Sequence, residues 1–200
     1  MTEMGLEYEM KFRGTPESQL RLRQEIAGEE TEYSMETTYY DTPGGAMSAR
    51  HYTLRCRQEN DKSVCTLKTP AQDGGRQEYE LECPDIQSAI PMLCKLSDIK
   101  ELPHLLSEGV VPICGARFTR IAKNVILPDC VVELALDRGI LTGGGREVPL
   151  CEVEVELKQG SREGAYAYAV ALAAKYGLES EPLSKFRRAQ LLAKGEEETL

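Results

Sequence analysis

Charged side chains occupy every second position in three segments of this chain. Charged and apolar residues alternate over 6–12 and 151–158, and arginine alternates with apolar residues over 54–57. In a β-strand, residues two apart point to the same face of the sheet. Each segment therefore predicts a strand with one apolar and one charged face, and carboxylate clusters are sorted onto different strands from the arginine pair.

The same alternation, with much Val, Thr, Tyr and Ile, predicts eight strands. They cover 4–13, 32–41, 52–58, 63–69, 76–83, 116–127, 131–139 and 147–158. Mostly short turns rich in Gly, Pro, Asp and Asn join them, which indicates an antiparallel meander. Helices are expected after Thr15, over 85–107 with interruptions at Pro91 and Pro103, after Ser161 and after Ser184. The fold class is α+β, an eight-stranded antiparallel β-barrel or tunnel with helices packed outside.

Closure of the sheet would direct one face of every strand inward. Helices can cover the apolar face from outside, so we expect Tyr8, Met10, Val153 and Val155 to pack outward. The charged faces would then line the interior. Burying many charges without water costs several kcal/mol for each ion, so this interior must be hydrated.

Two pairs of carboxylates point to a metal site. Glu7 with Glu9, and Glu152 with Glu154, each place two side chains about 7 Å apart along one strand face. If the first and last strands meet, four carboxylates converge and repel one another unless a cation lies between them. Oxygen ligands select Mg²⁺, Mn²⁺ or Ca²⁺. The alternative is a solvated outer face on which these carboxylates pair with Lys and Arg.

Basic side chains on several strands point to an anion-binding face. They are Lys11, Arg55, Arg57 and Lys68. Arginine binds phosphate oxygens in bidentate fashion. The alternative is a surface ladder of cross-strand ion pairs. Arg120 and Lys123 differ in parity, so both can point inward only if a bulge separates them, and otherwise one points out.

Composition excludes several other classes. The net charge of −9 argues against general binding to nucleic acid or membrane surfaces. Seven irregularly spaced cysteines and only two histidines argue for reduced structural thiols and against triad chemistry. No apolar run approaches a membrane span, and no signal peptide is evident. We expect a cytoplasmic protein with a single domain over residues 1–195 and a frayed acidic tail over 196–200.

A series of short motifs runs in fixed order from residue 7 to residue 188. They are Glu7-Tyr8-Glu9-Met10-Lys11, Tyr39-Tyr40-Asp41-Thr42-Pro43, Leu54-Arg55-Cys56-Arg57, Thr66-Leu67-Lys68, Arg76 with Glu78 or Glu80, Glu133-Leu134-Ala135-Leu136-Asp137, Cys151-Glu152-Val153-Glu154-Val155-Glu156-Leu157, and Ser184-Lys185 with Arg188. Together they resemble the CYTH superfamily, the triphosphate tunnel metalloenzymes. The likeness is greatest to the bacterial inorganic triphosphatases.

This resemblance implies a tunnel that binds triphosphate with Mg²⁺ or Mn²⁺ and hydrolyses a terminal phosphoanhydride. It implies metal ligands at Glu7, Glu9, Asp137, Glu152 and Glu154, with Glu133 in support. It implies substrate binding by Lys11, Arg55, Arg57, Lys68, Arg120, Lys123, Lys185 and Arg188. The catalytic set is then Glu7, Glu9, Lys11, Glu152, Glu154 and Lys185.

The substrate is open to several interpretations. Inorganic triphosphate is favoured. Thiamine triphosphate would want an aromatic platform for its cationic ring, and this chain has nine Tyr but no Trp. Adenylate cyclisation, as in class IV adenylate cyclases, is a third candidate. A non-catalytic polyphosphate or nucleotide sensor is the alternative of another class, although binding alone needs only the basic residues. The expected partner is a small polyanion, bound by a monomer or homodimer without nucleic acid or membrane.

Overall fold

The computed structural model describes residues 2–71 and 75–196, with side chains described from Tyr8 onward. The strands are β1 (Thr2–Glu7), β2 (Glu9–Arg13), β3 (Glu30–Asp41), β4 (Thr53–Glu59), β5 (Lys62–Pro70), β6 (Arg76–Glu82), β7 (Val111–Ile126), β8 (Cys130–Gly143), β9 (Arg146–Gly160) and β10 (Glu179–Ser180). The helices are α1 (Pro16–Glu25), α2 (Ala46–Ala49), α3 (Ile86–Ser97), α4 (Leu102–Leu105), α5 (Arg162–Tyr176) and α6 (Lys185–Lys194). The described strands form one antiparallel sheet in the order β1-β6-β5-β4-β3-β7-β8-β9-β2-β10.

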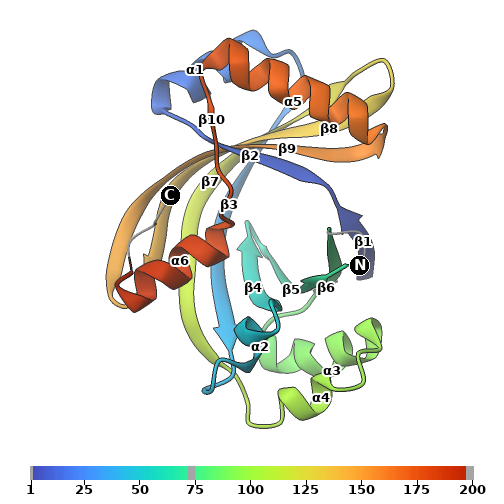
Figure 1. The fold of residues 1–200 in the computed structure, drawn as a ribbon, viewed down its shortest axis with the longest axis vertical. Helices are drawn as coiled ribbons and strands as arrows, with labels where there is room; N and C mark the ends of the chain where they lie inside the picture. Colours follow the sequence, from blue (N-terminus) through green and yellow to red (C-terminus); the bar gives the residue numbers. More distant parts are fainter. Residues whose placement is uncertain (1, 72–74, 197–200) are drawn as a thin grey trace.

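This architecture confirms the predicted α+β class, with a large curved antiparallel sheet and most helices outside it (Figure 1). The first predicted strand is divided at Tyr8. β1 pairs with β6, and β2 pairs with β9, so the two halves lie near opposite ends of the strand order. The hydrogen-bonded ladder does not close on itself. Instead, Tyr8 links β1 to β2 covalently and so connects the two ends of the strand order. The sheet curves around a central space.

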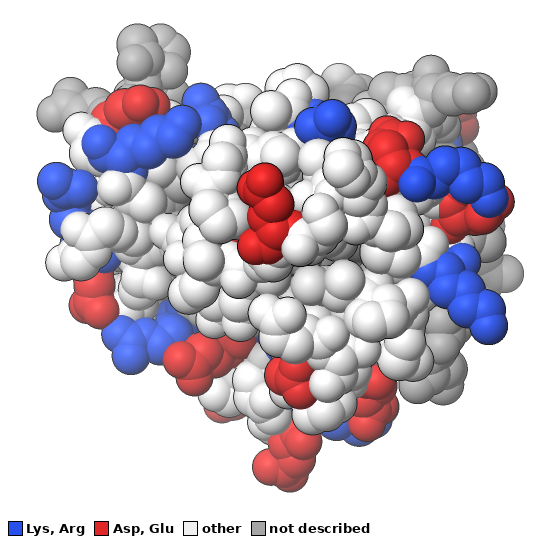
Figure 2. All heavy atoms as spheres, turned by 90° about the horizontal axis from the view of Figure 1, so that it is seen from below, with Lys and Arg blue, Asp and Glu red and all other residues white. Residues whose placement is uncertain are grey.

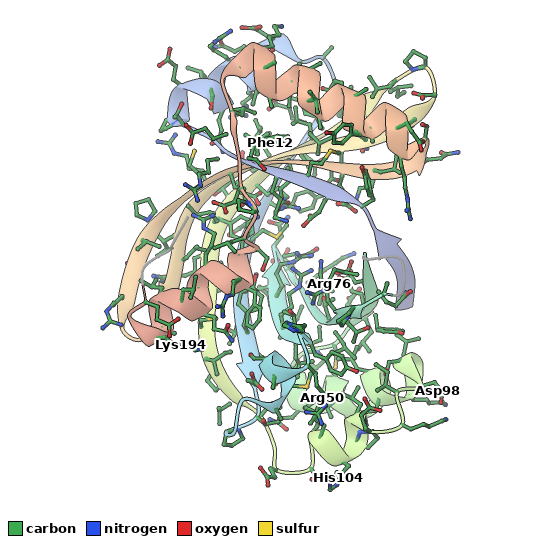
Figure 3. The ribbon with its side chains drawn as sticks, in the orientation of Figure 1. Phe12, Arg50, Arg76, Asp98, His104 and Lys194 are labelled. Carbon is green, nitrogen blue, oxygen red and sulfur yellow. The ribbon has the colours of Figure 1, made fainter. Side chains whose placement is uncertain are left out.

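Apolar side chains on the convex face lie beneath the outer helices. α1 and α5 cover a cluster that includes Phe12, Leu134, Val153 and Val155, and Figure 3 shows Phe12 between these helices and the sheet. Tyr8 and Met10 pack against the same cluster. A second cluster lies under α2, α3 and α4 and is built from Leu54, Leu67, Leu81 and Leu93, among others. Each such fully buried side chain contributes about 1.5–3 kcal/mol relative to exposure. The outward packing expected of Val153 and Val155 is therefore confirmed.

Helix α3, which packs on β5 and β6, differs from the prediction in one respect. The predicted helix interruption at Pro91 is wrong, because α3 continues through it. Pro91 lies in the second turn of α3 and is exposed, and the Asp85 side chain secures the helix start by accepting a hydrogen bond from Ser88 N at 2.9 Å. Figure 2 shows this end of the molecule from below, with a mostly uncharged centre and charged side chains around it.

α6 differs from the other helices because it packs on the inner face of the sheet, against β7 and β8. Its cap is Ser184, as predicted, whose Oγ accepts a hydrogen bond from Arg187 N at 3.2 Å. Gly143 on β8 permits the close approach, since a Cβ there would lie 2.5 Å from the Ala189 carbonyl oxygen. No helix in the described part of the chain is long and apolar enough to span a membrane.

Candidate active site

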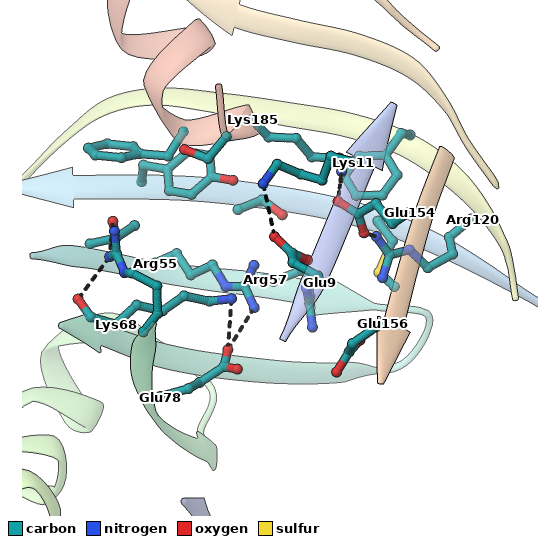
Figure 4. Close-up of a pocket in the computed structure, with 18 of the residues that line it drawn as sticks. Glu9, Lys11, Arg55, Arg57, Lys68, Glu78, Arg120, Glu154, Glu156 and Lys185 are labelled. Carbon is teal, nitrogen blue, oxygen red and sulfur yellow. Dashed lines mark hydrogen bonds and ion pairs between the residues drawn. The ribbon is translucent and has the colours of Figure 1, made fainter. Parts of the chain in front are cut away.

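A cavity of about 820 Å³ occupies the space that the curved sheet encloses. β2 to β9 and the start of α6 contribute to its lining, and Figure 4 shows charged side chains from opposite walls pointing into it. The charged residues that line it are Glu9, Lys11, Arg55, Arg57, Glu59, Lys68, Arg76, Glu78, Glu80, Arg120, Glu133, Glu154, Glu156, Lys158, Lys185 and Arg187. The interior is therefore polar, as the alternation predicted.

Basic side chains from neighbouring strands form one wall. Arg55 and Arg57 come from β4, and Lys68 comes from β5, where Thr53 and Lys68 are register partners. Glu78 on β6 contacts two of these groups, with its Oε1 3.4 Å from Arg55 Nη2 and 3.2 Å from Lys68 Nζ (Figure 4). Burial and the neighbouring Arg55 lower the pKa of Arg57. These cations are thus held in place on the sheet and concentrate positive charge on one side.

Carboxylates form the facing wall. Glu9, Glu156 and Glu133 stand in one register row across β2, β9 and β8. Lys158 neighbours this row, with its Nζ 3.0 Å from Glu156 and 3.9 Å from Glu133. Lys11 lies opposite Glu154 in the next row and contacts Glu9 at 3.2 Å. Burial opposes the charge on Lys11, but Glu9 and Glu154 outweigh it and raise the Lys11 pKa.

A buried ionic cluster lies behind this wall. Its carboxylates are Asp137 and Glu152, both fully buried, together with Glu154. The Nζ of Lys185 lies 2.8 Å from Asp137 Oδ2 and 2.7 Å from Glu154 Oε1, and it also contacts Glu152. Arg120 holds Asp137 through two bonds of 2.7 Å and also donates to Glu154.

The cluster fixes the charge of its members. Burial alone would lower the pKa of Lys185, but Asp137, Glu154 and Glu152 raise it well above its ordinary value. Burial would raise the pKa of Glu154, but Lys185 and Arg120 outweigh it and hold that pKa well below the ordinary range. Burial dominates at Glu152, whose pKa rises to about 8 although Lys185 opposes the shift. The surrounding carboxylates therefore favour the protonated form of Lys185.

Most of the residues predicted to bind substrate or metal meet in the cavity. Those that line it are Glu9, Lys11, Arg55, Arg57, Lys68, Arg120, Glu154 and Lys185. Asp137 and Glu152 lie behind Lys185 instead. Arg188 contacts Glu152 at 3.1 Å and the buried Glu181 at 3.7 Å. The backbone of Glu7 pairs with Arg76, and its side chain lies outside the described part of the structure.

Lys123 does not belong to this site. It shares the outer face of β7 with Ile121, and its Nζ donates to the carbonyl oxygens of Arg23 and Ile26 at 2.6 and 2.8 Å. The same Nζ lies 3.1 Å from Glu30. The predicted substrate role of Lys123 is therefore wrong. The parity rule that separates it from Arg120 holds, and the ammonium instead binds carbonyls at the end of α1.

The structure adds cavity residues that were not chosen as site residues. Glu156 and Lys158 continue the period of two that marks Glu152 and Glu154, so the same rule could have found them. Glu133, which was expected only to support the metal ligands, also lines the cavity. Arg187 and the aromatic ring of Phe186 enter from α6, and no local pattern marks them. Phe186 packs against Tyr39, with ring centroids 5.1 Å apart.

The donor chemistry fits a divalent cation. Carboxylate oxygens of Asp137, Glu152 and Glu154 lie within 4.8 Å of one another, and hard oxygen ligands suit Mg²⁺ or Mn²⁺. The Lys185 ammonium, however, already contacts all three. The carboxylates that line the open cavity are Glu9, Glu133, Glu154 and Glu156 on β2, β8 and β9, and Glu59, Glu78 and Glu80 on β4 and β6.

Similar proteins were found among curated sequences and among solved structures. An inorganic triphosphatase from Haemophilus influenzae is 28% identical over 192 residues, which cover 93% of this chain and 54% of that protein. The chain thus spans about half the length of that curated relative. Among solved structures, a Hippeastrum protein described as an adenylyl cyclase candidate with a dominant triphosphatase activity superimposes with a TM-score of 0.65 at 20% identity, covering 96% of this chain and 98% of that one.

A second solved structure, a Bacillus halodurans protein described as a candidate adenylate cyclase, gives a TM-score of 0.62 at 15% identity, over 92% of this chain and 97% of that one. At these identities the two structures establish a shared fold. The sequence of residues 5–189 matches the CYTH domain family. That match includes both walls of the cavity and the first turn of α6, and the chain belongs to the CYTH domain family.

Proposed function

We propose that this protein hydrolyses the terminal phosphoanhydride of inorganic triphosphate in a reaction that depends on Mg²⁺ or Mn²⁺. The observation that carries the proposal is one cavity with a basic wall on β4 and β5 and a carboxylate wall on β2, β8 and β9. A triphosphate needs cations along its length and a metal at the reacting phosphate. The basic wall offers the cations, and the carboxylate wall offers oxygen ligands for the metal. The similarity to an inorganic triphosphatase supports the choice of substrate.

The basic wall would bind the phosphate oxygens. Arg55 and Arg57 can each present a planar fork to a phosphate, and Lys68 supplies a point charge beside them. Glu78 and Glu59 hold these side chains in the absence of substrate. Because the cations are already positioned on rigid strands, little ordering remains to be done when substrate binds.

The carboxylate wall would hold the metal through Glu9, Glu154 and Glu156. When bound, Mg²⁺ or Mn²⁺ would neutralise charge on the reacting phosphate and orient the attacking water. Lys185 and Arg120 border the same region and would stabilise negative charge that develops on the phosphate oxygens. Hydrolysis by this route needs no covalent nucleophile from the protein.

An organic triphosphate is a second candidate, favoured by one specific observation. The cavity lining includes the aromatic side chains of Tyr33, Tyr39, Phe118 and Phe186. Inorganic triphosphate has no ring that could stack on them. A thiamine or nucleoside group could stack on such a surface. Three of these rings already have a partner, since Tyr39 packs on Phe186 and the Lys185 ammonium lies 5.4 Å from the Phe118 centroid. We therefore rank this candidate second.

One assay tests both candidates. Phosphate release would be measured with tripolyphosphate, ATP, thiamine triphosphate and pyrophosphate, with Mg²⁺ or Mn²⁺ and with EDTA. We expect tripolyphosphate to be the best substrate and EDTA to stop its hydrolysis. Faster turnover of thiamine triphosphate or ATP would favour the second candidate. Turnover that survives EDTA would contradict the metal-dependent mechanism, and no phosphate release from any substrate would favour a binding protein.

Lys185→Ala tests the contribution of α6. A lost charge-assisted contact to phosphate costs roughly 1.5–3 kcal/mol, which corresponds to a loss of about tenfold to a hundredfold in kcat/KM. The matched control is Lys175→Ala, because Lys175 also pairs with a glutamate but is exposed on α5. Wild-type kcat/KM in the Lys185 variant would show that Lys185 does not contribute to substrate binding or turnover.

A further inference from the structure

Two cysteines face each other on the outer side of the basic wall. Cys56 on β4 and Cys65 on β5 are direct register partners, and their sulfur atoms lie 2.7 Å apart. All seven cysteines lie in the described part of the chain, and this is the pair among them whose sulfurs are in contact. The mechanism proposed above uses neither thiol.

The backbone geometry at this pair suits a disulfide. Opposite residues in an antiparallel ladder have Cα atoms about 4.5–5.5 Å apart. A disulfide joins Cα atoms separated by about 4.4–6.8 Å, with sulfurs about 2.05 Å apart. The sulfur atoms of Cys56 and Cys65 are therefore within a fraction of an ångström of bonding distance. The register of β4 and β5 thus already brings the two sulfurs together.

The two thiols are not equivalent, and the difference suits an attacking and a resolving role. Cys56 is partly exposed, whereas Cys65 is fully buried beneath α3. The Cys65 thiol donates a hydrogen bond to the Cys56 sulfur, which outweighs burial and lowers the pKa of Cys56 to about 6, with help from Ser63. The same bond, together with burial, raises the pKa of Cys65. A thiolate is the nucleophilic form of cysteine, so the exposed partner is also the reactive one.

We propose that Cys56 and Cys65 form a modification site that hydrogen peroxide converts to a disulfide. The Cys56 thiolate attacks one peroxide oxygen, the O–O bond breaks, and hydroxide leaves with the electron pair, which gives a sulfenic acid. The Cys65 sulfur then attacks the Cys56 sulfur, the S–O bond breaks, and the Cys65 proton leaves with the oxygen as water. The two sulfurs together lose two electrons, and peroxide is reduced to two waters.

This site lies next to the cavity without being part of it. Arg55 and Arg57 flank Cys56 in sequence and point to the opposite face of β4. Oxidation therefore joins β4 and β5 directly behind the side chains that form the basic wall. The chemistry does not depend on the proposed hydrolase activity, because the product is read by mass.

The experiment treats the full-length protein with hydrogen peroxide and then alkylates it under denaturing conditions. Tryptic digestion should link the peptide Cys56–Arg57 to the peptide 63–68, with the mass of two hydrogens lost. The count of free thiols should fall from seven to five and return to seven with dithiothreitol. Cys56→Ser should abolish the link. The matched control Cys151→Ser, which removes another partly exposed thiol, should retain it.

Three results would overturn the proposal. The first is oxidation of Cys56 to sulfinic or sulfonic acid without a linked peptide. The second is a link to another residue, such as the nearby Cys83, whose carbonyl oxygen lies 3.8 Å from the Cys65 sulfur. The third is an unchanged thiol count. Because the wild-type digest decides all three, the proposal can fail even if a variant does not fold.

Discussion

Gly143→Ala should displace α6 and thereby reduce activity from a position outside the cavity lining. Gly143 does not adopt a left-handed backbone conformation, so its replacement acts through steric contact alone. An added Cβ would lie 2.5 Å from the Ala189 carbonyl oxygen and 2.8 Å from Ala193 N, whereas real Cβ contacts essentially never fall below 3.0 Å. The helix must therefore move by at least 0.5 Å.

The magnitude follows from this displacement. Overpacking of this kind costs about 1–3 kcal/mol, which for a chain of this size lowers Tm by roughly 2–12 °C. Ala189 lies one helical turn after Lys185, so the shift reaches the ion pairs of 2.7–2.8 Å that hold its ammonium. A misplacement of about 1 Å can cost about a hundredfold in rate. Half that distance, on a logarithmic scale, gives about a tenfold loss in kcat/KM.

The measurement compares thermal melts with tripolyphosphate kinetics at 25 °C. Gly44→Ala is the matched control, because nothing lies within 4 Å of its added Cβ and its backbone is not left-handed. We expect the control to behave as wild type. If Gly143→Ala lowers Tm but leaves kcat/KM unchanged, the position of α6 does not matter to the reaction. If both stay at wild-type values, the close approach itself is refuted.

Further variants separate structural from functional roles. Lys123→Met removes charged hydrogen bonds to α1 carbonyls, so Tm should fall by the equivalent of about 1.5–3 kcal/mol with kcat/KM unchanged; a raised KM at normal Tm would restore its substrate role. Burial would raise the pKa of Glu181, but Arg13 outweighs it and the pKa is lowered, so this pair stabilises the fold above pH about 4.3 and loses that contribution on acidification. The Tm deficit of Glu181→Gln should accordingly be present at pH 7 and shrink as the pH falls below the ordinary glutamate pKa of about 4.3, and a constant deficit would contradict the ionic origin. Glu9→Gln should nearly abolish turnover and leave the metal-free Tm unchanged or slightly raised, because it removes one of several like charges; a fall of many degrees would identify Glu9 as a structural partner of Lys11.

The sequence predicts the strands well because one rule governs nearly all of them. The alternation of charged and apolar residues over 151–158 corresponds in the structure to a charged inner face and an apolar outer face of β9. The same rule cannot reveal the break at Tyr8. Charged and apolar residues alternate through 6–12 without interruption, and no turn residue marks the junction.

The site is less predictable because burial within a face depends on tertiary packing. Parity places Asp137 and Glu152 on the same face as Glu154, and the structure agrees. Nothing in the strand pattern indicates that α6 will dock on this face and seal the first two behind Lys185. The docking of α6 requires a residue without a side chain at Gly143, because a Cβ there would clash with the helix. The sequence does not reveal this requirement, since it depends on where α6 packs.

The junction at Tyr8 has a consequence for the order in which this chain can fold. Glu7 pairs with Arg76, 69 positions away, and Glu9 pairs with Glu156, 147 positions away. On the ribosome, β1 can pair with β6 once about the first two fifths of the chain have emerged, but β2 must wait until β9 has been synthesised. Until then β2 remains an open edge strand, the form most prone to aggregation. Contacts this distant also slow folding, because the entropy of loop closure must be overcome first.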